Sequence, residues 1–133
     1  MNIVVDTSVI IAVISNESQK DRLIELTKGA DLVAPPSIHW EIGNAFSAML
    51  KRGRLTLHQT LKAIEVYHKI PVRYAEIELE DTLRIAAEYN IYSYDAYLLR
   101  CALKYNAPLI SLDRNLVRIA KEMNVVVIEV QEE

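Results

Sequence analysis

The sequence predicts an α/β fold with three layers, in which a five-stranded, mostly parallel sheet lies between two layers of helices. Short β-branched runs alternate with longer segments of helical period, and this alternation is typical of β-α-β units. The chain has 133 residues, of which 51% are hydrophobic and 25% charged, so we expect a single domain over residues 1–133.

The five candidate strands are apolar along most of their length, as strands covered by helices on both faces must be. In chain order they span residues 2–6, 31–34, 72–74, 108–112 and 125–129.

Seven candidate helices fill the intervals. The first follows Asp6 directly, and the clearest begins after Pro35 and Pro36 and ends near Gly53. That helix carries an apolar stripe of Ile38, Ile42, Ala45, Phe46 and Met49. The others span residues 16–28, with Gly29 as the stop, 56–69, 79–89, 94–105, with Ser93 as N-cap, and 114–123.

Charge and cysteine content limit the possible functions. Fifteen basic and 18 acidic residues give a net charge of −3, so a bound polyanion would need a local basic patch or metal ions. A single cysteine, Cys101, excludes an intrachain disulfide and suits a reducing compartment. The sequence shows neither an apolar run of the ~20 residues that span a bilayer nor a basic leader, so we expect a cytoplasmic protein without a membrane segment.

Two acidic residues follow predicted strands. Asp6 ends the first strand and Asp113 follows the fourth, which places both at the carboxyl edge of the sheet, where open α/β folds bind ligands. Either residue could instead be the N-cap of the helix that follows it. The sequence leaves both interpretations open.

Two further acidic residues share helix faces with apolar side chains. Glu41 lies on the stripe of Ile38 and Ile42 and therefore points toward the sheet. With Ser37 as N-cap, a capping box would need its acid at Trp40, so capping does not explain Glu41. Asp95 shares a face with apolar residues but also lies in the first turn of a helix, where the macrodipole favours an acid.

In a doubly wound sheet these four positions converge on one edge, so the acids are expected to form one pocket. Two carboxylates about 4 Å apart repel by about 4 kcal/mol at an effective dielectric constant of 20, so a cation should bind there. Hard oxygen ligands select Mg²⁺ or Mn²⁺. Such ions can activate a water nucleophile and stabilise a leaving oxygen, which indicates phosphoryl chemistry.

With these motifs the chain resembles the PIN-domain ribonucleases, and among them the VapC-type toxins of toxin–antitoxin pairs. The matching pieces are Asp6-Thr7-Ser8 after an apolar strand, Glu41 early in the helix after Pro35-Pro36, Asp95-Ala96 opening a helix, and Ser111-Leu112-Asp113 after an apolar strand. They occur in the family order and span nearly the whole chain.

The resemblance implies strand order 3-2-1-4-5 and an Mg²⁺- or Mn²⁺-dependent endoribonuclease, a hydrolase of phosphodiester bonds. Asp6, Glu41, Asp95 and Asp113 would be the catalytic metal ligands, although the metal contact of Asp113 varies most across the family. Ser8 would support Asp6, and Ser111, where the family often has Thr, would hold the loop of Asp113. The resemblance also implies a homodimer and a cognate antitoxin protein that reaches into the site.

Basic and aromatic residues are candidates for RNA contacts. Lys51, Arg52 and Arg54 end the helix of Glu41, where cations also complement the helix C-terminus, and Arg114 follows Asp113. A group of tyrosines flanks Asp95 and could stack on bases or form a subunit interface. Its members are Tyr89, Tyr92, Tyr94, Tyr97 and Tyr105.

Two other functions were compared with the ribonuclease. In a non-catalytic binding module acting through a partner protein, the acids would be N-caps or would bind one structural ion. A phosphatase with Asp6 as nucleophile is disfavoured, because Ser8 stands where such enzymes usually carry a second Asp. The choice of RNA over single-stranded DNA rests on the resemblance alone, since no residue evidently reads a 2′-hydroxyl.

Overall fold

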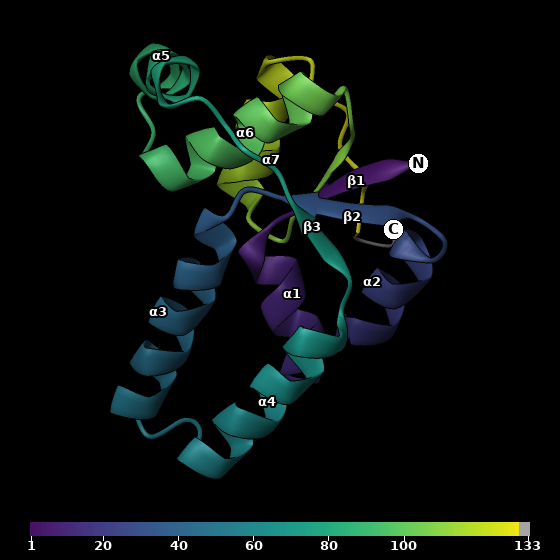
Figure 1. Ribbon diagram of the computed structural model, residues 1–133, viewed down its shortest axis with the longest axis vertical. Coiled ribbons are helices and arrows are strands. Elements are labelled where there is room, and N and C mark those ends of the chain that lie inside the picture. The colour runs from purple at the N-terminus through teal and green to yellow at the C-terminus, as the bar shows by residue number, and fades with distance from the viewer. Residues whose placement is uncertain (131–133) are drawn as a thin grey trace.

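Four parallel strands form the sheet, in the order β3-β2-β1-β4 (Figure 1). This computed structural model describes residues 1–130. The strands are β1 (Asn2–Val5), β2 (Asp31–Ala34), β3 (Val72–Tyr74) and β4 (Leu109–Ile110). The helices are α1 (Thr7–Ile14), α2 (Lys20–Thr27), α3 (Ser37–Lys51), α4 (Leu57–Lys69), α5 (Leu79–Tyr89), α6 (Ser93–Tyr105) and α7 (Arg114–Glu122).

The prediction of a fifth strand over residues 125–129 was wrong for the described part of the chain. Val127 makes only an isolated parallel bridge to Leu109. It rests on two hydrogen bonds, from Leu109 N–H to the Val126 carbonyl (2.8 Å) and from Ile128 N–H to the Leu109 carbonyl (2.9 Å). The ladder is short because β4 itself ends at Ile110, where the chain turns toward Asp6.

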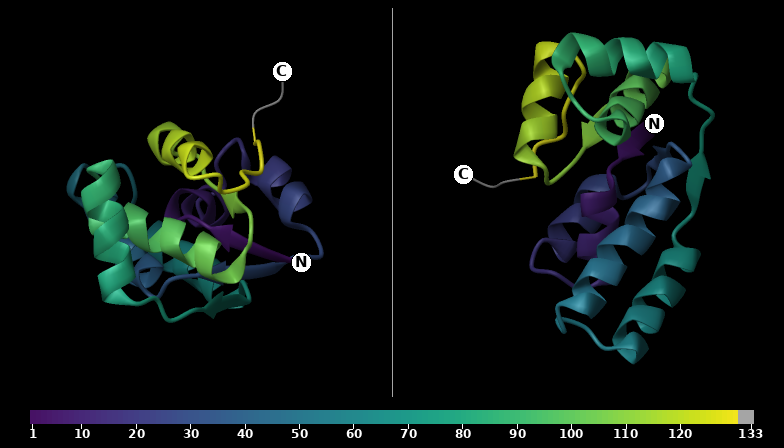
Figure 2. Two further views of the ribbon diagram at one scale, coloured as in Figure 1. Left: turned by 90° about the horizontal axis from the view of Figure 1, so that it is seen from above. Right: turned by 90° about the vertical axis from the view of Figure 1, so that its left-hand side faces the viewer.

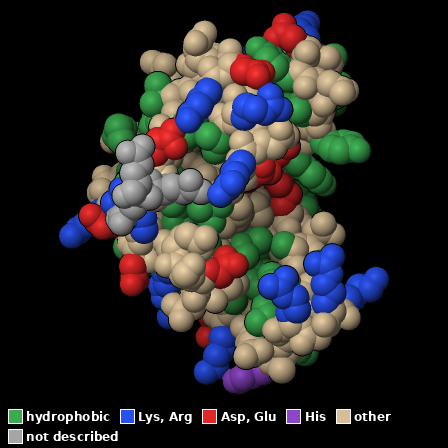
Figure 3. All heavy atoms as spheres, turned by 180° about the vertical axis from the view of Figure 1, so that it is seen from behind, with side chains coloured by type: hydrophobic (Ala, Val, Ile, Leu, Met, Phe, Trp, Pro, Cys, Tyr) green, Lys and Arg blue, Asp and Glu red, His purple; other side chains and the backbone are tan. Residues whose placement is uncertain are grey.

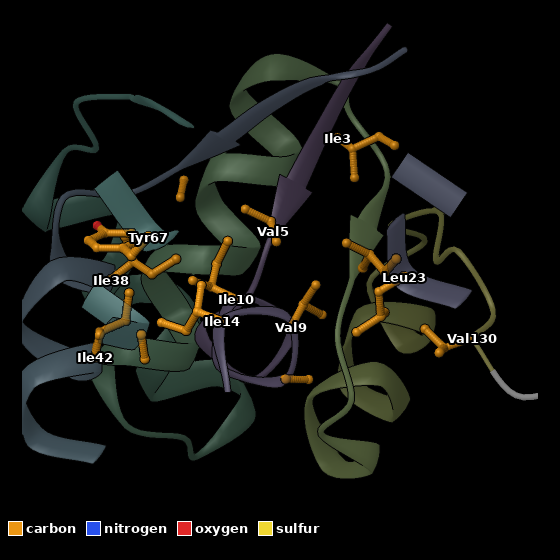
Figure 4. Packing of buried hydrophobic residues seen from close by; sticks show 14 of the residues in the cluster. Ile3, Val5, Val9, Ile10, Ile14, Leu23, Ile38, Ile42, Tyr67 and Val130 are labelled. Carbon is orange, nitrogen blue, oxygen red and sulfur yellow. The ribbon is translucent and has the colours of Figure 1, made fainter. Parts of the chain in front are cut away.

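Helices cover both faces of the sheet, as predicted, with α1–α4 on one side and α5–α7 on the other (Figures 1 and 2). The alternation along β1 builds both cores, since Ile3 and Val5 pack in the first layer and Val4 in the second. Figure 4 shows Val5 close to Ile10 of α1 and Ile38 of α3. Each such fully buried aliphatic side chain stabilises the fold by about 1.5–3 kcal/mol.

Three predicted helix starts were wrong by a few residues. Helix α2 begins at Lys20, not at residue 16, because Asn16 adopts a left-handed φ of 57° and a run of turns follows. Helix α4 begins one residue later than expected and α6 one residue earlier, whereas α3 begins directly after Pro36, as predicted. Ser37 and Ser93 are therefore the first helical residues, and the N-caps are Pro36 and Tyr92.

The hairpin of α3 and α4 projects away from the sheet (Figure 1). It turns at Gly53, whose φ of +69° suits glycine, and α4 starts with a capping box between Thr56 and Gln59. Glu41 lies in the second turn of α3, near the sheet, whereas Lys51 ends the helix. None of the helices in residues 1–130 is long and apolar enough to cross a membrane.

Candidate acidic site

Asp6 lies directly after β1 and is the N-cap residue of α1. Its side chain makes no capping hydrogen bond, so the capping interpretation does not account for it. Instead, its Oδ2 accepts hydrogen bonds from Ser8 Oγ (2.8 Å) and Ser111 Oγ (2.7 Å). Asp6 is only 6% exposed, and a carboxylate this deeply buried requires such partners.

The two serines connect the loops after β1 and β4. Ser8 Oγ accepts the Leu112 N–H (3.0 Å), and Ser111 Oγ accepts the Asp113 N–H (3.0 Å). Each hydroxyl therefore receives one hydrogen bond from the backbone and donates one to Asp6. These chains fix the position of the Asp6 carboxylate and the path of the loop that carries Asp113.

Ser111→Ala is expected to destabilise the protein by about 1–3 kcal/mol, because it removes one partner from the buried Asp6 Oδ2 and one from the partly buried Asp113 N–H. Urea unfolding measures this change. The control is Ser18→Ala, at an exposed serine whose hydroxyl hydrogen-bonds only to its neighbour Gln19 among residues 1–130. Equal unfolding midpoints for wild type and Ser111→Ala would contradict the proposed role of the serine.

Burial is the main cause of a raised Asp6 pKa, and the charge of Asp113 adds to it. The hydroxyls of Ser8 and Ser111 lower the pKa and offset part of this rise. A nearby cation stabilises the charged form of a buried carboxylate, because its attraction replaces the interaction with water that burial removes.

Glu41 is half-buried, on the side of α3 that faces the sheet. Burial, followed by the charges of Asp6 and Asp95, raises its pKa to about 7. The nearby hydroxyls of Ser37 and Thr7 lower it in part, yet neither gives Glu41 Oε2 a hydrogen bond of ordinary geometry. This buried oxygen is an acceptor without a partner, and such groups are commonly satisfied by an ion or a water molecule.

Asp95 lies in the first turn of α6, as the sequence predicted, and is partly buried. Its pKa is raised by burial, then by the charges of Asp113 and Asp6. The helix N-terminus favours a negative charge in that turn, but it does not outweigh these effects.

Asp113 is the true N-cap among the four acids. Its Oδ1 accepts hydrogen bonds from the Asn115 N–H (2.9 Å) and the Leu116 N–H (3.2 Å) at the start of α7. The side chain is exposed, and its charge acts on both Asp6 and Asp95. Capping and proximity to the other acids therefore coexist at this residue.

The charge of Asp113 raises the pKa values of Asp6 and Asp95, and the charges of those two raise the pKa of Glu41. The four acids therefore form one electrostatic group at the carboxyl edge of the sheet. Even so, no three His, Cys, Asp or Glu side chains within residues 1–130 are close enough to enclose a metal ion. Mg²⁺ is usually held by one or two carboxylates and keeps several waters, so an open arrangement of hard oxygen donors suits it. The unpartnered oxygen of Glu41 supports the same fit.

The basic candidates lie in different places. Lys51, Arg52 and Arg54 are exposed at the hairpin end of α3, where several basic side chains gather (Figure 3). Lys51 is ten residues beyond Glu41, or about 15 Å along the helix axis. Arg114 instead follows Asp113 directly and is exposed, so of the four it is nearest in sequence to the acids.

Three residues near the acids received no functional role from the sequence. The hydroxyls of Thr7 and Ser37 influence Glu41, and the ring of Trp40 stands exposed beside it on α3. Thr7 lies within the Asp6-Thr7-Ser8 motif, and this was the available signal for it. The sequence indicated only a capping role for Ser37. Trp40 lies off the apolar stripe of Ile38 and Ile42, and this was the signal for its exposed ring.

The sequence matches the family model described as PIN domain over residues 3–122. No curated protein sequence matches the chain.

Three solved structures illustrate the similarity of fold. PAE2754 from Pyrobaculum aerophilum is 23% identical to this chain, with a TM-score of 0.71. The alignment covers 96% of this chain and 83% of PAE2754. FitAcB from Neisseria gonorrhoeae is 15% identical, with a TM-score of 0.67, and the alignment covers 96% of this chain and 97% of the other. VapBC2 from Rickettsia felis, bound to a DNA fragment from its promoter, is 14% identical, with a TM-score of 0.66. The alignment covers 96% of this chain and 98% of the other. Identities this low establish the shared fold alone.

Proposed function

The chain belongs to the PIN domain family, whose members are generally nucleases, and on this premise we propose that it is a metal-dependent endoribonuclease acting through its acidic site. One observation carries the proposal. The buried carboxyl group of Asp6 and the half-buried one of Glu41 lie at the carboxyl edge of a parallel sheet, both with raised pKa values, and Glu41 has an unpartnered oxygen. Burying such charges is unfavourable for stability, and a cation would offset that cost.

Asp6, Glu41 and Asp95 would hold the ion, Mg²⁺ or Mn²⁺, with Asp113 at the rim of the site. When bound, the ion would lower the pKa of a water nucleophile and stabilise the leaving oxygen of a phosphodiester. Ser8 and Ser111 keep the Asp6 carboxylate in one orientation. Below about pH 7 the carboxyl group of Glu41 holds a proton. A cation that binds to this carboxyl group would displace the proton.

The relatives suggest a biological setting. The complexes from Rickettsia felis and Klebsiella pneumoniae are described as VapBC2 and as a toxin–antitoxin complex. We propose accordingly that this chain is the VapC-type toxin of such a pair, acting in the cytoplasm as a homodimer and held inactive by a cognate antitoxin. Of the basic candidates, Arg114 is nearest in sequence to the acids and would contact a phosphate there, whereas Lys51, Arg52 and Arg54 would contact more distant parts of an RNA.

Purified protein is expected to cleave a mixed RNA pool with Mg²⁺ or Mn²⁺, to stop when EDTA is added, and to resume when excess metal is restored. A parallel reaction with single-stranded DNA determines the substrate class. Cleavage that continues unchanged in EDTA would contradict a metal-dependent mechanism.

One observation favours the alternative of a non-catalytic module that acts through a protein partner. Asp113 already serves as a helix cap, and among residues 1–130 no three acids lie close enough together to enclose an ion. A calorimetric titration with Mn²⁺ distinguishes the two, since capping residues alone predict no binding. No heat change together with no cleavage would favour the binding module.

A further inference from the structure

A groove of about 670 Å³ opens between the first turns of α3 and α6. These turns lie near each other at the left of Figure 1, above the α3–α4 hairpin. Aromatic and polar side chains line the groove, chiefly those of Ser37, Trp40, Glu76, Glu78, Tyr94 and Tyr97.

The groove lies next to the acidic site. Trp40 precedes Glu41 on α3 and Tyr94 precedes Asp95 on α6, and neighbouring residues of a helix point about 100° apart. The aromatic faces of both helices therefore adjoin their acidic faces. Ser37 also links the two, because it lines the groove while its hydroxyl lowers the pKa of Glu41.

The rings in the groove are exposed to solvent. Trp40 is 66% exposed and Tyr94 is 50% exposed, so neither belongs to a core. Aromatic rings left in water beside a reactive site favour binding of a flat, apolar group, and every nucleobase has such a face.

The charges around the groove disfavour a phosphate inside it. Its lining contains the carboxylates Glu76 and Glu78 and no Lys or Arg among the residues described. Lys104 pairs with Glu78 (Nζ to Oε2, 2.7 Å) and donates to the Glu76 carbonyl (3.0 Å), so this cation is already engaged. A strand crossing the acids would thus keep its phosphates with the metal and place a neutral base in the groove.

We propose that the groove is a stacking site for an unpaired base of the RNA, next to the phosphate that is cleaved, with Trp40 and Tyr94 as the stacking surfaces. This inference rests on the proposed nuclease function and adds to it a subsite for the base beside the cleaved phosphate. A base held in a duplex cannot enter the groove without leaving its own stack.

Cleavage of a single-stranded RNA by Trp40→Ala and Tyr94→Ala tests the proposal. Each variant is expected to lower kcat/KM by about 5- to 150-fold, the effect of losing one base–aromatic stack, while Mn²⁺ affinity and melting temperature stay as in wild type. Trp40→Phe should retain most of the activity. The control is Leu61→Ala on α4, because Leu61 is 55% exposed but does not line the groove.

A second readout comes from Trp40 itself, the single tryptophan of the chain. Its fluorescence should be quenched by a single-stranded RNA octamer in Mg²⁺, and a fully paired duplex of the same sequence should quench it much less. Wild-type protein serves here, with the fluorescence read immediately after mixing and before cleavage proceeds, because Asp6→Asn is expected to lose the metal that holds the phosphates.

The outcomes separate this inference from the proposed function. Wild-type cleavage with unchanged kcat/KM in both alanine variants would overturn the stacking site and leave the nuclease standing, and the groove would then be assigned to a protein partner. If wild type does not cleave RNA, the function itself fails. In that case, the absence of octamer-induced quenching would overturn the stacking site as well.

Discussion

Asp6→Asn is expected to reduce RNA cleavage by more than about 100-fold. Loss of groups that merely orient metal ligands typically costs 10- to 100-fold in affinity or activity, and Asp6 is proposed as a ligand itself. The substitution removes the negative charge but keeps an oxygen that can accept from Ser8 and Ser111. The fold should therefore persist while the metal site fails.

Thermal unfolding without metal distinguishes loss of chemistry from loss of structure. Because the carboxylate is buried and repelled by Asp113, Asp6→Asn should melt at the same temperature as wild type or higher. Asp21→Asn, at an exposed residue in the first turn of α2, is the control and should cleave normally. Cleavage at the wild-type rate by Asp6→Asn would exclude Asp6 from the metal site.

Glu41→Gln is expected to stabilise the metal-free protein at pH 8. The folded state raises the pKa of Glu41 from 4.5 to about 7, so between these values the folded protein binds more protons than the unfolded chain. Stability therefore falls as pH rises through that window and stays reduced above it. The full shift corresponds to about 3 kcal/mol, and solvent screening of a half-exposed group reduces this to about 1–2 kcal/mol.

Urea unfolding of wild type and Glu41→Gln from pH 4 to pH 8 measures the effect. The two proteins should be equally stable near pH 4 and diverge as pH rises toward 7. Glu17→Gln, at an exposed residue of the turn after α1, should follow wild type throughout. If the difference between wild type and Glu41→Gln were the same at every pH, the carboxyl group of Glu41 would not be the cause.

The layers of the fold and the position of the acids at the carboxyl edge of the sheet could be predicted from the sequence. Both depend on the spacing of apolar residues, which a single sequence shows. The apolar runs of β1 and β2 require burial on both faces, and parallel strands align their carboxyl ends, so Asp6 had to lie at that edge. Glu41 could be placed because the stripe of Ile38, Ile42 and Phe46 fixes which side of α3 faces the sheet.

The remaining features depend on contacts between distant segments. Whether residues 125–129 form a full strand depends on how far β4 extends, and β4 ends at Ile110, directly before the serine that donates to Asp6. The aromatic groove joins the starts of α3 and α6, which lie more than 50 residues apart in the sequence. For Asp113, capping and a place beside the acids are compatible, so sequence reasoning could not choose between them.

The most direct test of a single acidic metal site is a calorimetric titration with Mn²⁺ of wild type and of the Asp6→Asn, Glu41→Gln and Asp95→Asn variants. The three residues come from α1, α3 and α6 or their caps, and only the fold brings them together. We expect saturable binding by wild type that each substitution weakens strongly. Binding of equal strength in all four proteins, or no binding by wild type, would contradict the site.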